Sequence, residues 1–376
     1  MSTASESSTT PARIDRGTLL KRTAGIALGT SLYSFGDPLT VLAAQLTPKA
    51  LKPDGDLAYF NWAQYIDPKL LRGFEKEYKV KVNESNFTNM ETMLAKLRSG
   101  VKYDVSFPEA QTAAQLVKAG FLAPLDHSKI TNWSQVNAAF HNPWYDAGAK
   151  YTVPYAIWTT GIAWRTDKVK GMTGSWNDLF SHPEAAKHTF LLDDFREVLG
   201  MGLLATGTKD VNSTSASAVA KAQAKILTLK PRLRGFTSLN TQMANGSSWL
   251  THMWSGTVYQ ALISGMKNPE NLHYQVNKEG IPVGSDTMVQ FKNAPHPNTA
   301  TLFLNYMLRP ENSAANVKVI GYPMMTTQGL KTYDGLTKKY PWLKVTSGEV
   351  EKGQRFKPQD PKTLQLWTTA WSKIQA

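Results

Sequence analysis

From Leu57 onwards, short apolar runs alternate with longer segments whose apolar residues recur at helical spacing. Residues 57–60 predict a buried strand, and residues 68–78 predict a helix with an apolar face. Asp67 is expected to cap this helix because Pro68 suits the first helical position. A repeated succession of strand and helix indicates an α/β fold whose strands are joined through helical crossovers.

Further elements follow from the same reasoning. Thr88 and Glu91 have the spacing of a capping box, which predicts a helix that ends near Gly100. The remaining expected elements are a second strand at 103–107, two consecutive extended segments at 152–155 and 161–164, a second α/β set at 189–262, a strand at 288–291 and a helix at 298–307.

The chain length favours two lobes, because 376 residues exceed what one hydrophobic core usually organises. We expect lobe 1 to comprise residues 45–158 plus 286–330, and lobe 2 to comprise residues 159–285 plus 331–376. The first crossover between the lobes is placed near residue 158, between the two extended segments.

The first 44 residues have the organisation of an export signal, with a basic region, a modest apolar stretch at 24–32 and small residues at Ala43 and Ala44. The apolar stretch is too short to span a bilayer. Arg16 opens a segment that resembles a twin-arginine motif in which Gly17 replaces the second arginine, so the export route stays open. The chain has no cysteine, which excludes disulfides and a lipid anchor on Cys. We therefore expect an exported protein of the periplasm or the outer face of the cytoplasmic membrane, not anchored by lipid through Cys.

Net charge is strongly positive, at +13 for the whole chain. The expected signal holds four basic and three acidic residues, so its removal leaves +12. No basic run with interleaved aromatic residues and no nucleic-acid motif is found, which argues against a nucleic-acid partner. Scattered positive charge fits electrostatic association with an anionic cell envelope.

Catalytic and metal chemistry find little support in the sequence. It offers no cysteine nucleophile, no Gly-x-Ser-x-Gly elbow and no credible Ser/His/Asp set, so we expect no enzymatic activity. The 7 histidines lack metal-ligand spacing, and no glycine-rich phosphate loop is present. We expect no metal and no cofactor.

Several short motifs resemble those of bacterial spermidine/putrescine-binding proteins of ABC importers. The resemblance covers nearly all of the chain after the expected signal, and its two most specific blocks are Asp-Asp-x-Arg-Glu and Gly-Tyr-Pro. The matching blocks, in chain order, are residues 61–66, 93–100, 104–108, 192–198, 254–256, 277–280 and 320–323. The resemblance implies a two-lobed periplasmic-binding-protein-like fold, with a mixed sheet flanked by helices in each lobe and a ligand cleft between the lobes.

The same resemblance implies a ligand site. Aromatic cleft positions fall on Trp62, Tyr65, Trp254 and Tyr322, and carboxylates that hold amines fall on Asp194, Glu197 and Asp286. Carboxylates alternating with aromatic faces suit a polyamine, which carries several charged ammonium groups on apolar spacers at neutral pH.

This chain departs from the family pattern on one side of the cleft. Gln64 replaces an acid between the cleft Trp and Tyr, and Ala63 replaces a hydroxyl-bearing residue. Glu109 and Gln111 stand where the family has Ser and Tyr, and Gly284 replaces a Trp two residues before the last carboxylate. Gln64, Glu109 and Gln111 are therefore kept as candidate further contacts.

Structural interpretations of the same residues stay open. Asp194 and Glu197 have capping-box spacing, and Arg196 between them could neutralise a carboxylate. The large aromatic residues could be core residues, and Asp286 could be a turn residue. Glu109 and Gln111 could be solvated residues at a helix start. Asp193 is expected to point away from the site.

We therefore expect a monomeric receptor that captures a putrescine- or spermidine-like cation by hinge closure and delivers it to an ABC transporter permease. Two alternatives remain: a binding protein for another cationic or quaternary amine, and a basic envelope-associated protein that is not a receptor.

Overall fold

The computed structural model describes residues 51–376, so the export segment expected at residues 1–44 lies outside the described part. In residues 51–376 no helix is both long and apolar enough to cross a membrane.

Strands run through both halves of the described chain and join in one path, in the order β2-β1-β3-β9-β4-β7-β5-β6, with β8 paired to β4. β1 and β2 are parallel, β5 is parallel to β6 and β7, and β4 is antiparallel to its three neighbours. The strands are β1 (Leu57–Trp62), β2 (Val82–Phe87), β3 (Val105–Ser106), β4 (Thr152–Arg165), β5 (Thr189–Leu191), β6 (Leu233–Phe236), β7 (Leu250–Trp254), β8 (Leu272–Gln275) and β9 (Val283–Gln290).

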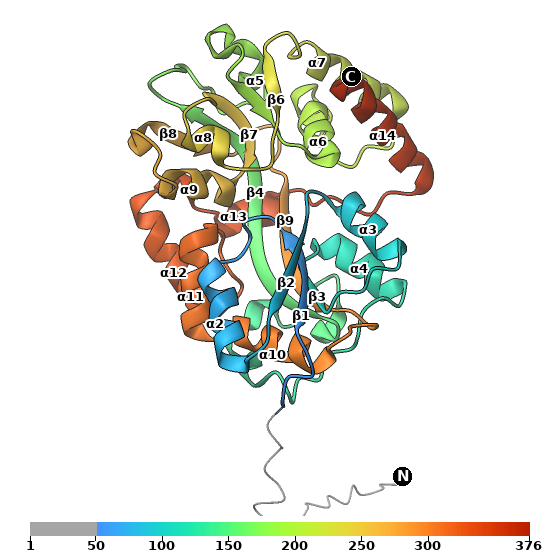
Figure 1. The fold of residues 1–376 in the computed structure, drawn as a ribbon. Helices are drawn as coiled ribbons and strands as arrows, with labels where there is room; N and C mark the ends of the chain where they lie inside the picture. Colours follow the sequence, from blue (N-terminus) through green and yellow to red (C-terminus); the bar gives the residue numbers. More distant parts are fainter. Residues whose placement is uncertain (1–50) are drawn as a thin grey trace, which may run out of the picture. The chain divides into compact units, whose positions relative to one another are not determined.

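Helices cover both halves of this sheet (Figure 1). Around β1, β2 and β3 lie α2 (Pro68–Tyr78), α3 (Met90–Arg98), α4 (Ala110–Lys118) and α10 (Pro297–Met307). α11 (Pro310–Ile320) and α12 (Thr327–Lys339) pack against each other. The other helices are α5 (Asp178–Ser181), α6 (Phe195–Ala205), α7 (Ala216–Leu227), α8 (Thr241–Ala244), α9 (Ser255–Ile263), α13 (Ser347–Lys352) and α14 (Pro361–Gln375). Of these, α6, α7 and α14 pack together.

Strand β4 connects the two halves of the sheet. Residues 152–159 pair with β9, and residues 160–165 pair with β7 and β8. Figure 1 shows β4 running through the centre of the described chain. The two extended segments predicted at 152–155 and 161–164 are therefore parts of one strand, because residues 156–159 between them pair with β9 and Thr160 pairs with β7.

The two faces of β1 are buried against different helices. Tyr59 packs edge-on against Phe303 of α10, at 5.6 Å between ring centroids. Phe60 points to the other face, where it lies in a separate apolar cluster with Met93 of α3 and Leu116 of α4. This alternation is what a strand buried on both faces requires.

Several local predictions are confirmed and others are wrong. Asp67 caps α2, as predicted, by accepting a hydrogen bond from the Lys69 N–H at 2.8 Å. The cap of α3 is Asn89, which accepts from the Thr92 N–H, so the predicted capping box at Thr88 and Glu91 is wrong. The sequence pattern also missed β2 and overstated β3, which has two residues.

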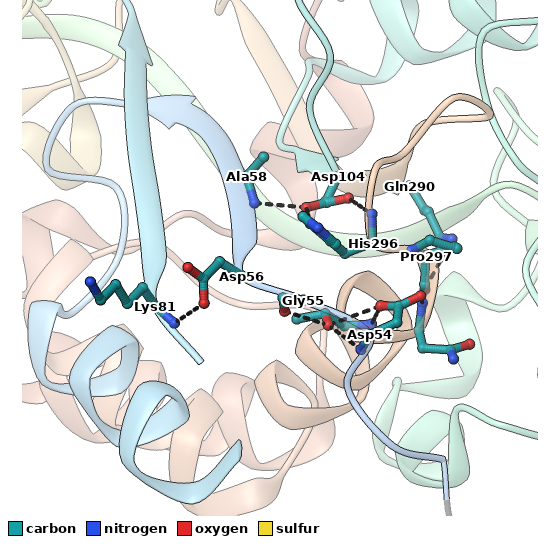
Figure 2. Close-up of polar contacts among 11 residues, drawn as sticks. Asp54, Gly55, Asp56, Ala58, Lys81, Asp104, Gln290, His296 and Pro297 are labelled. Atoms are coloured by element: carbon teal, nitrogen blue, oxygen red, sulfur yellow. Dashed lines mark hydrogen bonds and ion pairs between the residues drawn. The ribbon is translucent and has the colours of Figure 1, made fainter. Parts of the chain in front are cut away.

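A polar network ties the beginning of β1 to the beginning of α10 (Figure 2). The buried carboxylate of Asp104 accepts hydrogen bonds from the Ala58 N–H at 2.7 Å and the His296 N–H at 2.6 Å. Asp54 accepts from the Thr299 N–H at 3.0 Å, within the first turn of α10. These bonds fix the start of β1, whose other end carries Trp62.

Candidate functional site

A cavity of about 320 Å³ lies between the two halves of the sheet. It is built at the carboxyl ends of parallel strands, because residues within three positions after β1, β5 and β6 line it. Ligand sites of open α/β sheets characteristically form at such strand ends. The lining residues are Trp62, Ala63, Gln64, Tyr65, Phe87, Thr88, Glu109, Trp158, Asp193, Phe236, Thr237, Ser238, Leu239, Trp254, Thr257, Gln260, Asp286 and Tyr322.

Aromatic side chains from distant parts of the chain form two walls of the cavity. Trp62 and Trp254 meet edge to face, with ring centroids 6.0 Å apart. Tyr65 and Tyr322 meet in the same way at 5.5 Å. The Trp62 indole N–H donates to the Phe107 carbonyl at 3.0 Å, so its orientation is fixed. Apolar faces on both sides suit a ligand with methylene groups.

The Tyr322 ring lies against the first turn of α9. A Cβ atom added to Gly256 would lie 2.3 Å from a ring carbon of Tyr322, so this approach requires glycine. The Tyr322 hydroxyl accepts from the Thr257 N–H at 3.2 Å. The matched Trp-Ser-Gly and Gly-Tyr-Pro blocks thus meet in space.

The loop after β1 is braced by buried polar contacts. Tyr155 donates to the Tyr65 carbonyl at 2.6 Å, and Asn316 donates to the Tyr155 hydroxyl at 2.7 Å. Gln64 adopts a left-handed backbone conformation, with φ of 60°. The Gln260 side chain donates to the Gln64 carbonyl at 2.9 Å, which links this loop to α9. Backbone strain of this kind is typical of ligand sites.

Asp286 is a buried carboxylate in β9, with 3% of its surface exposed. One oxygen accepts a hydrogen bond from the Tyr65 hydroxyl, whereas Oδ1 finds no donor among residues 51–376. Burial raises the pKa of Asp286 to about 7, and polar contact with Tyr65 and, more weakly, Trp158 opposes the rise. Asp286 lies within a strand, so the interpretation as a turn residue is wrong.

Glu109 adds a second buried carboxylate beside Asp286. The two residues form an isolated antiparallel bridge, and the Gln111 side chain donates to the Glu109 carboxylate. Burial raises the pKa of Glu109 well above its usual value, and negative charge on Asp194 and Asp286 raises it further. Glu109 and Gln111 are both buried, so the interpretation as solvated helix-start residues is wrong.

The first turn of α6 brings two more acids close to the cavity. Asp194 is the N-cap and accepts from the N–H groups of Arg196 and Glu197. The Glu197 side chain does not return to the cap. Its Oε1 instead accepts from the Trp254 indole N–H at 2.9 Å and from the Thr160 hydroxyl at 3.0 Å. Only half of the predicted capping box is therefore formed, and Glu197 orients an aromatic wall.

Nearby positive charge does not offset the burial of Asp194 and Glu197. Burial and the negative charge on Glu91 raise the pKa of Asp194 to about 6. Burial and the negative charge on Asp194 raise the pKa of Glu197 to about 8. The Nη2 atom of Arg196 lies 3.3 Å from Oε1 of Glu91 in α3. Arg196 lowers the pKa of Asp194 without restoring it to the usual value.

The structure brings most of the expected site residues to one cavity. Seven line it, namely Trp62, Gln64, Tyr65, Glu109, Trp254, Asp286 and Tyr322. Within the described part of the chain, Gln111, Asp194 and Glu197 stand behind the lining residues rather than among them. Asp193 lines the cavity, so the expectation that it points away is wrong.

Other lining residues were missed by the sequence reasoning. The loop at 236–239, Gln260 and Trp158 are the main examples. Trp158 shares one face of β4 with Ala156 and Thr160 by strand alternation, but the hydrogen bond from Thr160 to Glu197 that marks this face is visible only in the structure. Predicting β4 as two segments hid that alternation.

A second cavity of about 190 Å³ lies on the other face of the β4–β9 pair. Ile157 of β4 and Val283 and Ser285 of β9 line it, whereas Trp158 and Asp286 line the first cavity. The two strands therefore separate the two cavities.

The side chains that line the first cavity suit an organic cation rather than a metal ion. Among residues 51–376, no group of three His, Cys, Asp or Glu side chains is arranged to hold a metal. Within that range, none of the residues lining the cavity is Lys, Arg or His. Carboxylates and aromatic faces together can surround ammonium groups and cover the carbon chain that joins them.

Comparison with known proteins gives matches over most of the chain. The family model of bacterial extracellular solute-binding proteins matches residues 69–343. The chain is 30% identical to spermidine/putrescine-binding periplasmic protein 1 of Haemophilus influenzae, over 89% of this chain and 93% of the relative. It is 28% identical to a putrescine/agmatine-binding protein of Pseudomonas aeruginosa, over 90% of this chain and 96% of the relative.

A solved structure of the spermidine/putrescine ABC transporter substrate-binding protein PotD from Streptococcus pneumoniae superposes with a TM-score of 0.66. It is 27% identical to this chain, and the match covers 85% of this chain and 98% of PotD. The expected fold class, a two-lobed periplasmic-binding-protein-like fold, is confirmed. The family contains substrate-binding proteins rather than enzymes, and this chain belongs to the bacterial extracellular solute-binding protein family.

Proposed function

We propose that this protein is a receptor that binds a polyamine of the putrescine or spermidine type and delivers it to an ABC transporter permease. The observation that carries the proposal is a group of buried acids beside aromatic walls, without a cation among the described lining residues. Relatives named for polyamine binding, matched over most of their length, support the same ligand class.

The charge of the site points to a ligand with more than one positive group. Asp193, Glu109 and Asp286 all line the cavity. Burying a carboxylate without a partner costs several kcal/mol, and burial raises the pKa of Asp286 to about 7 and that of Glu109 well above its usual value. A ligand with two or more ammonium groups compensates several of these acids, whereas a quaternary amine compensates one. We therefore rank a polyamine above a choline-like ligand.

Recognition would use the residues expected from the sequence in two roles. Asp286, Glu109 and Asp193 would bind ammonium groups, and the four aromatic side chains Trp62, Tyr65, Trp254 and Tyr322 would cover the methylene chain. Gln64 would contribute its side chain at the rim. Asp194, Glu197 and Gln111 would act from behind, by orienting lining residues and adding negative charge.

The division into lobes is part of the same proposal. Residues 51–158 plus 286–330 would form one lobe and residues 159–285 plus 331–376 the other, with the cavity between them. Hinge closure would then occur about β4 and β9, the strands that run between the lobes.

A thermal-shift screen tests the ligand class. The panel should contain putrescine, spermidine, spermine, choline, lysine and neutral sugars. A ligand present at 100 times its Kd stabilises the folded state by about 2.7 kcal/mol, which gives a measurable rise in Tm. We expect at least one polyamine to raise the Tm and sugars to leave it unchanged. A rise with sugars and none with amines would refute the ligand assignment.

We further propose that the protein is exported as a monomer and is held near an anionic envelope by its basic surface. The charge of +12 after removal of the expected signal supports this, since basic residues near an anionic membrane contribute about 1 kcal/mol each. Co-sedimentation with anionic vesicles should fall steeply as salt rises. Equal binding to neutral vesicles would contradict it. Size-exclusion chromatography with light scattering tests the monomer.

A further inference from the structure

The floor of the cavity is the antiparallel pair of β4 and β9. Trp158 lies directly opposite Gly284 in the strand register, and Ala156 lies opposite Asp286. Residues opposite each other, and residues two apart on one strand, project from the same face of a sheet. Trp158, Gly284 and Asp286 therefore share one face of the strand pair, and the side chains of Trp158 and Asp286 line the cavity.

The presence of glycine at 284 is explained by the lack of space for a side chain there rather than by the backbone conformation. It lies inside β9 with ordinary strand backbone, where glycine is a poor choice because it packs nothing. A Cβ atom added there would lie 2.1 Å from Cζ2 and 2.5 Å from Cε2 of the Trp158 indole. The indole therefore fills the place that a side chain at 284 would take.

The indole so placed is next to the charged group of the site. Trp158 is diagonal to Asp286 across the strand pair, and polar contact with Trp158 and Tyr65 opposes the rise that burial causes in the pKa of Asp286. An ammonium group bound at Asp286 would lie beside the indole face, where carboxylate and aromatic ring stabilise the same cation.

We infer that Trp158 is a specificity-determining residue, whose indole contacts the end of the ligand bound at Asp286 and whose position depends on glycine at 284. This inference rests on the proposed function, because it assumes a cationic ligand in the cavity. It adds a contact from β4 to those carried by the loop after β1, by α9 and by Tyr322.

The first test measures ligand affinity by calorimetry with putrescine and spermidine. Trp158→Leu removes the aromatic face but keeps apolar bulk, and Trp158→Phe keeps a smaller face. A cation–π contact of the usual strength makes the expected loss roughly 3- to 30-fold for Trp158→Leu, with Trp158→Phe in between. The matched control is Trp164→Leu, on the same strand and outside the cavity lining, which should change affinity less than twofold.

The second test is a double-mutant cycle on the empty protein, followed by urea unfolding. Gly284→Ala should lower the unfolding midpoint in the parent, because its methyl group overlaps the indole. In the Trp158→Leu background the same substitution should be neutral or stabilising, since the space is open. The affinity of Gly284→Ala should also fall in the parent and stay unchanged in that background.

The outcomes separate the two proposals. If the parent binds a polyamine and Trp158→Leu binds it equally well, the role of Trp158 is wrong and the proposed function stands. If the parent binds no polyamine, the proposed function fails, and the ligand role of Trp158 fails with it. Equal effects of Gly284→Ala in both backgrounds would overturn the reciprocal packing of Trp158 and Gly284 in either case.

Discussion

Replacing Asp286 by Asn tests the charge recognition most directly. The side chain keeps its shape and can still accept a hydrogen bond from Tyr65, but it loses its negative charge. Because Asp286 is buried in a strand, with one carboxylate oxygen lacking a donor among the described residues, water cannot replace that charge for a bound ammonium.

The expected loss of affinity is large. Removing one partner of a desolvated charge pair costs about 2–5 kcal/mol, which corresponds to roughly 30-fold to several thousand-fold in Kd. The measurement belongs at pH 8, where the parent carboxylate is largely ionised, since burial raises the pKa of Asp286 to about 7.

The same substitution should stabilise the empty protein at alkaline pH. A carboxyl whose pKa is higher in the folded state stabilises the fold when protonated, and this contribution is lost as the pH rises from about 4 through about 7. The ionised parent therefore loses on the order of 4 kcal/mol as an upper bound, and the Asn variant loses none of it. The advantage of the variant should grow between pH 5 and pH 8.

Calorimetric titration and urea unfolding at the two pH values measure both effects. Asp334→Asn is the matched control, because it is the same substitution on an exposed side chain paired with Lys344. It should leave affinity unchanged. Parent-like affinity of Asp286→Asn, or a variant less stable than the parent at pH 8, would refute the argument.

Three further expectations follow from the same acids. Parent affinity should rise from pH 6 to pH 8.5, since burial raises the pKa of Asp286 to about 7 and that of Glu197 to about 8. Asp286 must ionise to pair with the ligand, and Glu197 must ionise to add negative charge behind the lining residues. Binding enthalpies that do not depend on the ionisation heat of the buffer would contradict this. Asp193→Asn, in the cavity lining, should weaken binding more than Asp194→Asn, which keeps the α6 cap. If titration gives the reverse order, charge recognition belongs to Asp194, behind the lining residues. Glu197→Ala should weaken binding more than Glu197→Gln, whose side chain can still accept a hydrogen bond from Trp254. Equal losses of affinity by titration would contradict a role of Glu197 in positioning Trp254.

Much of the site could be predicted because its residues lie in short motifs with fixed neighbours. Trp62 and Trp254 are the last residues of β1 and β7, Tyr65 lies three residues after β1, and Tyr322 follows the end of α11. Local order along the chain therefore sufficed to bring these residues to one cavity. The α2 cap at Asp67 was predictable for the same reason, since a cap depends on the next two or three residues.

The wrong predictions concern features that depend on contacts between residues far apart in the sequence. Glu91 pairs with Arg196, 105 residues away, and Asn89 caps α3 in place of Thr88. β2 is a polar edge strand, with exposed residues at several positions, so it has no hydrophobic signature. The interval between the two predicted extended segments is not a break in the strand, because Thr159 and Thr160 are buried where β4 passes from one half of the sheet to the other.

Trp158 shows the same difficulty within the site. Its place in the cavity depends on the register between β4 and β9, which joins residues more than 120 positions apart. The glycine at 284 can be noticed in the sequence as a departure from the family, but the side chain that fills its space can be identified only from the fold.

The separation of the two cavities by a single pair of strands offers a way to observe occupancy from outside. Ser285 lines the second cavity, whereas its neighbour Asp286 lines the first. The chain contains no cysteine, so Ser285→Cys would provide its one thiol for an environment-sensitive dye. A dye attached there would sit one strand thickness from the ligand without touching it. The fold thus supplies a reagentless reporter position for amines in solution.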